Sequence, residues 1–394
     1  MARKRLLLAL FVAIAVKSSA YGVMFTMLDD YREQFGISEA SLGFVIAIGF
    51  FTSFFAQLTI APLADRGFSR RLIFVGLSLA IFGNFAMAFA DSLPELLGAR
   101  FLSGVGLGCA LPAMRRVIIV SDREHLGRNL GRVLSCEVGG FAAGPVVSTF
   151  LVEPFGIPAP FVVIGVVLSL VTLVIFTLPI PEVPAEDHPT ERFAVDLLRD
   201  RAITAGVLIG IAVFFMIGVF DSLWALMMND LGAPTWMANT GVTIFVLPMV
   251  FMAPYGGRFV QRVGPFRAGG IGMLVGGACM ALYGAISLPW LLMTVFLVHT
   301  LNDGMTVTGA GVAVGMVAPH ERQAGAQGLL GGAQTLTGGV AASFAGVSYE
   351  ALGRTVTFAI AAIVIATLVT VSRLLVGDRW RLRGAAPTVA ASHG

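Results

Sequence analysis

Long, uninterrupted apolar stretches constrain this chain more than any other feature of its sequence. A helix needs about 20 mostly apolar residues to cross the hydrocarbon layer of a membrane. The runs show no alternation of polar and apolar residues, so they favour helices over the strands of a membrane barrel. The sequence therefore predicts an all-α membrane protein with about twelve transmembrane helices, at residues 6–28, 41–63, 72–90, 94–119, 130–152, 159–180, 203–228, 236–255, 267–287, 289–314, 326–346 and 355–376.

Composition also indicates a membrane solvent. Only 12% of the 394 residues are charged, whereas soluble domains carry about 25%, so the chain has too few charges to cover a water-facing surface of this size. Cys109, Cys136 and Cys279 all lie in apolar runs, and we expect neither a disulfide framework nor a metal site. The sequence has no nucleotide-binding P-loop, so we expect no cofactor and no ATP-driven step.

Positive charges indicate how the chain is oriented. If the N-terminus is cytoplasmic, 22 of the 26 Lys and Arg residues lie near the cytoplasmic face. Arg32 and Arg354 then lie near the other face, and Lys17 and Arg100 lie inside spans. This asymmetry follows the positive-inside rule and predicts an inner-membrane protein with both termini cytoplasmic. The first residues also resemble a secretory signal, but we expect them to be retained because their loss would break the asymmetry.

Aromatic and basic residues mark the expected membrane boundaries. Trp224, Trp236 and Trp290 fall at the outer ends of predicted spans, where an interfacial aromatic belt is expected. The arginine-rich segment from Arg379 to Arg383 is expected to contact anionic lipid rather than nucleic acid.

The chain is predicted to contain two similar halves. Short patterns recur in the same order at offsets of 192, 198 and 199 residues: Ala61-Pro62 as Ala253-Pro254, Gly127 as Gly325, and Gly139-Gly140 as Gly338-Gly339. Duplicated helical bundles with a site between them are typical of transporters. The polar interval 181–200 divides the apolar runs, so we predict an N-terminal six-helix bundle (1–180), a cytoplasmic central loop (181–200), a C-terminal six-helix bundle (201–380) and a cytoplasmic tail (381–394).

Several motifs resemble those of a known family. The loop after the second run reads Ala61-Pro-Leu-Ala-Asp65-Arg66-Gly67-Phe-Ser-Arg70-Arg71. It resembles the major facilitator superfamily signature Gly-x-Leu-Ala-Asp-Arg-x-Gly-Arg-Arg, with Ala61 in place of the first Gly and Gly67 one place early. A weaker copy at 257–264 has Gln261 in place of the acid. Residues 97–106 resemble the fourth-span motif of the family, and the stretch from Gly140 through Gly144 to Pro145 resembles the motif of its drug:proton antiporter group.

The resemblance implies a rocker-switch carrier of the major facilitator superfamily fold, with twelve helices in two pseudo-symmetric six-helix bundles. In such a carrier the loop acid, here Asp65, contacts the start of span eleven near Gln323 and an arginine, Arg115 or Arg116, and closes the cytoplasmic side. Small residues at Gly140 and Gly144 would let helices pack closely, and Pro145 would bend its helix. The expected conformational gate comprises Asp65, Arg66, Arg70, Arg71, Arg115 and Arg116.

Ionisable residues within the spans are functional candidates because they are costly in hydrocarbon. Lys17 and Glu137 could pair, either at a substrate or proton site or as a salt bridge that only fixes packing. His299 and Asp303 share one helix face and, with the adjacent Asn302, suit a proton relay or a merely structural polar patch. We take Glu137, His299, Asp303 and Arg100 as proton-coupling candidates. Substrate-cavity candidates are Lys17, Asn302, Asp221, Asp29 and Asp30.

These features favour a secondary active transporter that exports a drug-like or amphipathic solute in exchange for protons. The alternative is proton-coupled uptake or exchange of a small organic anion, recognised by Lys17, Arg100 and His299. An intramembrane enzyme is disfavoured because no nucleophile can be assigned to His299, the one histidine deep in a span. The expected partners are a small-molecule substrate, protons and the lipid bilayer, without nucleic acid, and the protein is expected to be a monomer.

Overall fold

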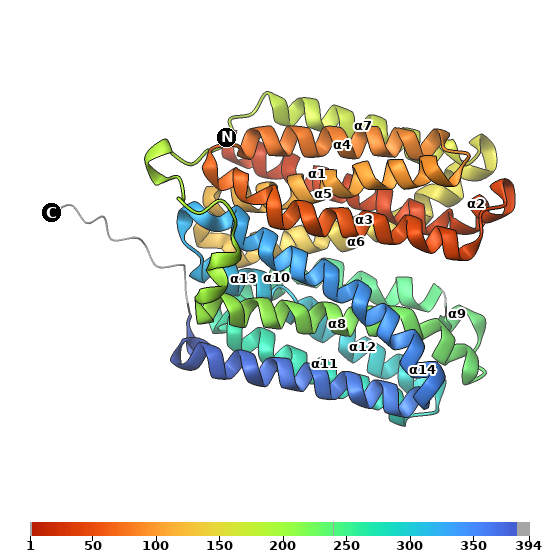
Figure 1. Ribbon diagram of the computed structural model, residues 1–394. Coiled ribbons are helices and arrows are strands. Elements are labelled where there is room, and N and C mark those ends of the chain that lie inside the picture. Colours follow the sequence, from red (N-terminus) through yellow and green to blue (C-terminus); the bar gives the residue numbers. More distant parts are fainter. Residues whose placement is uncertain (1, 239, 384–394) are drawn as a thin grey trace.

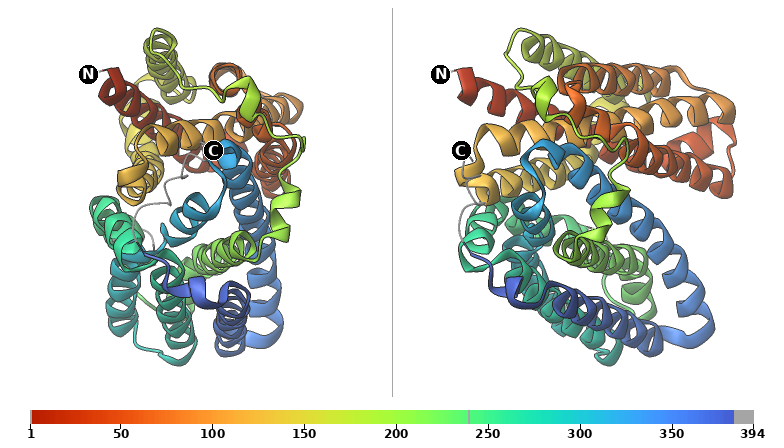
Figure 2. Two further views of the ribbon diagram at one scale, coloured as in Figure 1. Left: turned by 90° about the vertical axis from the view of Figure 1, so that its left-hand side faces the viewer. Right: turned by 60° about the vertical axis from the view of Figure 1, so that its left-hand side comes forward.

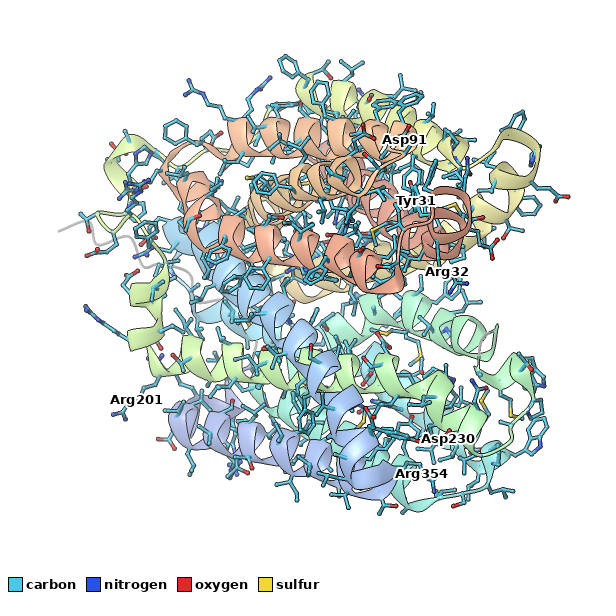
Figure 3. All side chains as sticks on the ribbon, turned by 45° about the vertical axis from the view of Figure 1, so that its right-hand side comes forward. Tyr31, Arg32, Asp91, Arg201, Asp230 and Arg354 are labelled. Atoms are coloured by element: carbon cyan, nitrogen blue, oxygen red, sulfur yellow. The ribbon has the colours of Figure 1, made fainter. Side chains whose placement is uncertain are left out.

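The computed structural model describes residues 2–238 and 240–383, and within this part of the chain the structure is helical, with no strand. The first and last described residues, 2 and 383, lie at the same end of an elongated helix bundle, on the left of Figure 1. We call this the terminal end and the opposite one the far end. Arg201 lies toward the terminal end, whereas Asp230 and Arg354 lie toward the far end (Figure 3).

The first bundle contains residues up to the polar interval. Its long helices are α1 (Ala2–Thr26), α3 (Glu39–Thr59), α4 (Ser69–Phe89), α5 (Leu93–Ser121), α6 (Leu126–Phe155) and α7 (Pro158–Phe176). Shorter elements are α2 (Leu28–Phe35) and the 3-10 turns η1 (Ala61–Arg66) and η2 (Arg123–His125). The polar interval, which we call the linker, contains η3 (Ala185–Asp187) and η4 (Val195–Arg199).

The second bundle follows the linker and lies beside the first (Figures 1 and 2). It contains α8 (Arg201–Asp230), α9 (Thr235–Ala238), α10 (Thr240–Val263), α11 (Pro265–Ala285), α12 (Pro289–Thr306), α13 (Gly309–Val317) and α14 (Gln323–Val376). The turn η5 (His320–Arg322) precedes α14, and η6 (Gly377–Arg381) follows it.

Nine helices in the described residues are long and apolar enough to cross a membrane by themselves. One of these contains two passes, because α14 breaks at Gly353, whose φ is +78°, and then runs back. The remaining passes are α10, and α12 continued by α13. The predicted fold of twelve transmembrane helices is confirmed. The eighth run was predicted to end at residue 255, but α10 continues to Val263 because its last turns carry arginines that reach beyond the hydrocarbon.

Large apolar side chains cover the outside of the molecule. Phe150, Leu374 and Val347 are more than two-thirds exposed, which in water would create apolar patches far larger than soluble proteins tolerate. In a bilayer the same side chains face acyl chains at no cost. The aromatic belt is partly as predicted: Trp236 and Trp290 are exposed, with ring centroids 5.7 Å apart.

The prediction for Trp224 was wrong. Its side chain is only 2% exposed, and its indole N–H donates to the carbonyl of Met237 at 3.0 Å. It packs against Phe220 and Phe296 within the second bundle, with ring centroids 5.1 and 4.8 Å away. The sequence position of Trp224 places it near the end of a span. It does not show whether the side chain faces the lipid or the interior of the bundle.

The two bundles meet at the terminal end along two helix pairs. The first part of α14 packs on α3, and α10 packs on α6. Gly127 lies against the backbone of Gly257, and Gly131 lies against the carbonyl of Ala253, so close that a Cβ atom at either glycine would not fit. The hydrogen bonds that join the two bundles in the described residues lie toward the terminal end, apart from that of Ser135 Oγ to the carbonyl of Val250, which lies near the middle of α10. The structure is thus closed at its terminal end.

We expect Gly131→Val to weaken this closure, because the added side chain must push α10 away from α6. Overpacking of this kind costs about 1–3 kcal/mol, which thermal unfolding of the purified protein would register as a lower melting temperature. Gly346→Val, at an exposed position of α14, is the control, since a Cβ there would meet nothing within 4 Å. Equal stability of the two variants would contradict the close backbone contact.

Candidate functional site

The carboxylate of Asp65 caps the first turn of α14 from the opposite bundle. Its oxygens accept hydrogen bonds from the backbone N–H groups of Ala324 (2.9 Å) and Gly325 (2.6 Å), and the side chain is 1% exposed. The first N–H groups of a helix have no partner within it, and the helix dipole favours an anion there. Asp65 therefore links η1 of the first bundle to α14 of the second.

Of the two neighbouring arginines, Arg116 is the one that faces Asp65. Its Nε lies 3.5 Å from Asp65 Oδ1, and its guanidinium also donates to Ser69 Oγ and the carbonyl of Pro181, both at 2.9 Å. Arg115 instead forms an ion pair with Glu137, at 2.9 Å. The ion pair of Glu137 is thus with Arg115 and not, as the sequence suggested, with Lys17.

The remaining arginines of the expected gate hold the first bundle and the linker together. Arg66 donates to the carbonyl of Thr190 and Arg70 to that of Phe176, both at 2.7 Å. Arg71 lies over the ring of Phe68, with its guanidinium carbon 5.3 Å from the ring centroid. These contacts fix the loop that carries Asp65 but do not themselves cross to the second bundle.

The linker is also tied to the second bundle. Arg322 donates to both oxygens of Asp196, at 2.6 and 2.8 Å. These hydrogen bonds hold the pKa of the Asp196 carboxyl below its ordinary value, since they favour the charged form. A depressed pKa means that this contact stabilises the fold at neutral pH and is lost only as pH falls through that pKa.

Gln261 occupies the position in the second bundle that corresponds to Asp65. Its side-chain oxygen accepts from the N–H of Gly127 at 2.7 Å, and its amide nitrogen donates to the carbonyl of Glu124 at 3.1 Å. It therefore caps α6 much as Asp65 caps α14. Gln57 adds a third contact between the bundles, donating to Thr335 Oγ1 at 3.3 Å. The sequence identified Gln261 only as a replaced acid and did not identify Gln57.

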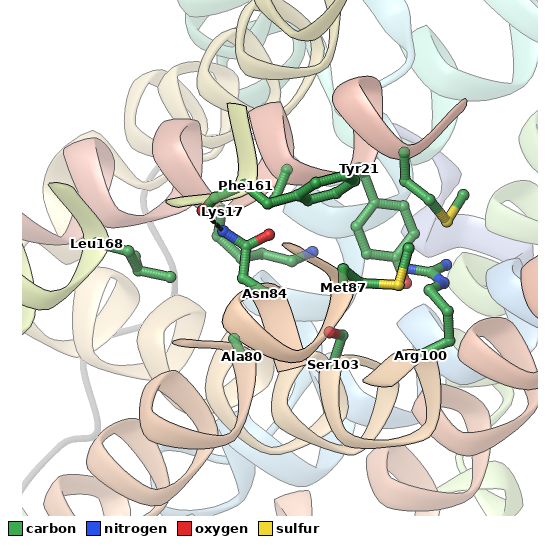
Figure 4. Close-up of a pocket in the computed structure, with 11 residues that line it drawn as sticks. Lys17, Tyr21, Ala80, Asn84, Met87, Arg100, Ser103, Phe161 and Leu168 are labelled. Atoms are coloured by element: carbon green, nitrogen blue, oxygen red, sulfur yellow. Dashed lines mark hydrogen bonds between the residues drawn. The ribbon is translucent and has the colours of Figure 1, made fainter. Parts of the chain in front are cut away.

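A cationic pocket lies within the first bundle, between α1, α4, α5 and α7 (Figure 4). Lys17 and Arg100 lie on either side of Tyr21, with Lys17 Nζ 4.5 Å and the Arg100 guanidinium carbon 4.3 Å from the ring centroid. Arg100 is 3% exposed and donates weakly to the carbonyl of Val45 at 3.4 Å. Within the described residues, one guanidinium nitrogen of Arg100 and the hydroxyl of Tyr21 are buried without a hydrogen-bond partner.

No carboxylate in the described residues lies within ion-pair distance of Lys17 or Arg100. Arg100 is buried without such a partner, which is costly unless another anion compensates it, whereas Lys17 is partly buried and lies within electrostatic range of Glu137. The space inside the pocket is small, about 20 Å³, which is enough for about one water molecule. Such a pocket has room for a small polar group but not for the whole body of a solute.

The second bundle holds the titratable cluster. His299 is 4% exposed; its Nδ1 lies 3.1 Å from the hydroxyl of Tyr283, and its Nε2 lies 3.5 Å from Asp303 Oδ2. Asn302 donates to Asp303 Oδ1 at 3.2 Å and to the carbonyl of Gly272 at 3.0 Å. A histidine held between a phenol and a carboxylate can exchange a proton with either neighbour.

The other predicted residues lie in three places. Asp221 is exposed on α8, within electrostatic range of Asp303. Asp30 lies on α2, beyond the end of α1, while the side chain of Asp29 is outside the described part. Gly140 and Gly144 pack directly against the backbone of α1, and Pro145 lies within α6, so this motif joins two helices of the same bundle.

Two tyrosines complete these sites and were missed in the sequence. Tyr21 follows Lys17 by four residues on the same helix face, a spacing that could have revealed it. Tyr283 lies on α11, whereas its partner His299 lies on α12. No local spacing connects them, because their contact depends on how the two helices pack.

The molecule has two bundles of membrane-spanning helices that meet at one end, and each bundle buries a few charged side chains. This arrangement is typical of a secondary transporter. The sequence matches the family model described as Major Facilitator Superfamily over residues 6–224 and 206–391. The chain therefore belongs to the major facilitator superfamily, whose members are transporters rather than enzymes.

Two curated relatives are named for different functions. The chain is 30% identical over 181 residues to the 4-hydroxybenzoate transporter PcaK of Pseudomonas putida, covering 45% of this chain and 40% of PcaK. It is 21% identical over 216 residues to the quinolone resistance protein NorA of Staphylococcus aureus, covering 53% and 55%. The chain thus spans about half the length of these relatives or less.

Solved structures share the fold at low identity. The human organic anion transporter MFSD10 has a TM-score of 0.81 at 14% identity, covering 94% of this chain and all of MFSD10. The proton:xylose symporter XylE has a TM-score of 0.76 at 14% identity, covering 94% of both chains. At these identities the comparisons show the fold alone.

We expect Asp65→Asn to open the terminal end more often, because an amide keeps the shape but loses one charge-assisted hydrogen bond to α14. Such bonds are worth about 1.5–3 kcal/mol. The population open at the terminal end should therefore rise about tenfold or more. The measurement is the labelling rate of Gln327→Cys, at a position 1% exposed in the closed structure, with the native cysteines replaced. Asp378→Asn, an exposed carboxylate at the same end, is the control, and equal labelling in both variants would contradict the capping role.

Proposed function

We propose that the protein carries a small organic anion, such as an aromatic carboxylate, across the inner membrane together with protons. The observation that carries this proposal is the pair of cations, Lys17 and Arg100, on either side of Tyr21 without a carboxylate partner in the described residues. A carboxylate would accept from the unpartnered Arg100 nitrogen and the Tyr21 hydroxyl, and its negative charge would offset one of the two positive charges.

The size of the pocket supports an amphipathic substrate. Since only a charged end fits beside Tyr21, the body of the solute must lie outside the pocket and between the bundles. The names of two similar proteins agree with this chemistry: PcaK is a 4-hydroxybenzoate transporter, and MFSD10 is an organic anion transporter. An aromatic ring with one carboxylate is therefore the substrate class we propose.

Protons are taken up in the second bundle under this proposal. Asp303 and His299 form the relay, and the exposed Asp221 lies within electrostatic range of Asp303. Protonation there would offset the negative charge of the substrate while the bundles rock between a state closed at the terminal end and a state open there. Asp65, Arg116 and Gln261 would hold that end closed in one state and release it in the other.

The orientation follows from charge. Most of the chain's Lys and Arg residues precede or follow the spans at the terminal end, so we place that end, with both termini, in the cytoplasm. The structure, closed at the terminal end, then represents the state that faces away from the cytoplasm.

Replacing either cation should impair anion transport. We expect Lys17→Gln and Arg100→Gln to raise the KM for 4-hydroxybenzoate, used as the probe, by about tenfold or more, because each removes a charged hydrogen-bond donor. The measurement is uptake into proteoliposomes under an imposed proton gradient. Arg201→Gln, an exposed arginine at the terminal end, is the control; unchanged KM in both test variants would contradict the anion site.

A second candidate is proton-driven efflux of an amphipathic drug, which the acidic pair Asp221 and Asp303 and the similarity to NorA favour. A cationic solute would bind these acids rather than Lys17 and Arg100. Symport and antiport move protons in opposite directions relative to the solute. A pH dye inside vesicles therefore distinguishes symport from antiport. Release of protons from the vesicle interior when a drug is added outside would favour the efflux function.

We expect Asp303→Asn to uncouple transport from protons, since an amide cannot carry the proton of the relay. Uptake driven by a pH gradient should fall to the level of passive equilibration, while exchange of labelled for unlabelled substrate continues. Asp230→Asn, whose carboxylate accepts from the exposed Tyr349 hydroxyl, serves as the control. Gradient-driven accumulation that persists in Asp303→Asn would exclude this residue from coupling.

A further inference from the structure

A groove with cations at its rim lies on the second bundle at the terminal end, away from the sites described above. It runs between the start of α11 and the end of α14, has a volume of about 420 Å³, and is bounded by η6. Arg267, Arg373 and Arg381 supply its charge, and Ile271, Leu274 and Trp380 supply much of its apolar lining.

The groove exists because η6 folds back over the helix ends. Gly377, with φ of +54°, ends α14 and allows the chain to reverse. Trp380 then packs directly on Gly270 of α11, where a Cβ atom would not fit, and is only 8% exposed. Arg373 lies over the indole, with its guanidinium carbon 5.4 Å from the ring centroid. The rim is therefore held in place by packing, and tryptophan at this level is typical of a membrane boundary.

The three rim arginines share one property: none has a carboxylate partner among the described residues. Arg379, in the same turn, differs because it lies 4.0 Å from Asp200. Three exposed cations on one groove repel one another unless an anion lies between them. Guanidinium groups bind phosphate with paired hydrogen bonds.

The apolar lining lies deeper in the membrane than the cations. Ile271 and Leu274 follow Arg267 by four and seven residues on one face of α11, roughly 6 and 10 Å further along the helix. Both side chains are nearly half exposed, at 48% and 45%. A free phosphate would satisfy the arginines but leave this surface bare, whereas a phospholipid carries an anion and a hydrocarbon chain in this order.

We propose that the groove binds an anionic phospholipid of the leaflet at the terminal end. Its phosphate lies among Arg267, Arg373 and Arg381, and an acyl chain follows Ile271 and Leu274. The bound lipid contacts both the start of α11 and the last turn of α14. It thereby stabilises the lipid-facing surface of the second bundle at the terminal end.

The experiment measures binding of phosphatidylglycerol to the purified full-length protein in detergent micelles, by native mass spectrometry, and the accompanying rise in melting temperature. The test variant is Arg267→Gln with Arg373→Gln and Arg381→Gln. The control removes the same charge from exposed arginines at the same end but outside the groove: Arg192→Gln with Arg201→Gln and Arg262→Gln. We expect binding to weaken about tenfold or more in the test variant and to change less than about twofold in the control.

Phosphatidylcholine and inorganic phosphate complete the design. Binding of phosphatidylcholine should not differ between the test and control variants. Inorganic phosphate alone should not raise the melting temperature. Equal losses in both triple variants would show a general effect of net charge and overturn the proposal, as would full protection by phosphate. If the triple variant does not fold, Arg381→Gln alone, in the exposed turn η6, should still weaken phosphatidylglycerol binding severalfold, and unchanged binding there would also overturn it.

Discussion

A carboxylate at the start of a helix holds the two bundles together where they meet. The first N–H groups of α14 have no partner in their own helix and lie buried between the bundles, where water is scarce, so a buried Asp65 satisfies them. Arg116 balances the charge and also bonds Ser69 and the carbonyl of Pro181, which begins the linker. The closing contact, the loop that supplies it and the linker thus form one hydrogen-bonded unit, and any opening of the terminal end must break it.

The sequence predicted those parts of the structure that local patterns encode. Uninterrupted apolar runs predicted the helices, and the resemblance of the loop around Asp65 to the signature of the major facilitator superfamily implied which helix start this residue would contact. The choice between Arg115 and Arg116 could not be made, because neighbouring side chains point about 100° apart on a helix and the rotation of α5 depends on tertiary packing. The same limit applies to Trp224 and to the contact of Tyr283 with His299, which joins different helices.

Charge is divided unequally between the bundles. The first bundle has Lys17 and Arg100 around one tyrosine, and the second has Asp303 beside one histidine, with Asp221 within electrostatic range of Asp303. A carrier with its cations on one side and its acids on the other can bind an anion and a proton on separate rigid bodies. The proposed coupling then needs no direct contact between substrate and proton, only a shared preference for one arrangement of the bundles.

The glycine contacts between α6 and α10 have a mechanical consequence. Where Gly127 meets Gly257 and Gly131 meets Ala253, main chain touches main chain with no long side chain between them. Two such surfaces can separate and rejoin without trapping or reshuffling rotamers, so each cycle avoids the entropy that ordering interdigitated side chains would consume. The glycine contact between α6 and α10 therefore adds little resistance to separation of the bundles. The polar contacts made by Asp65 and Gln261 at the terminal end then determine when the bundles separate.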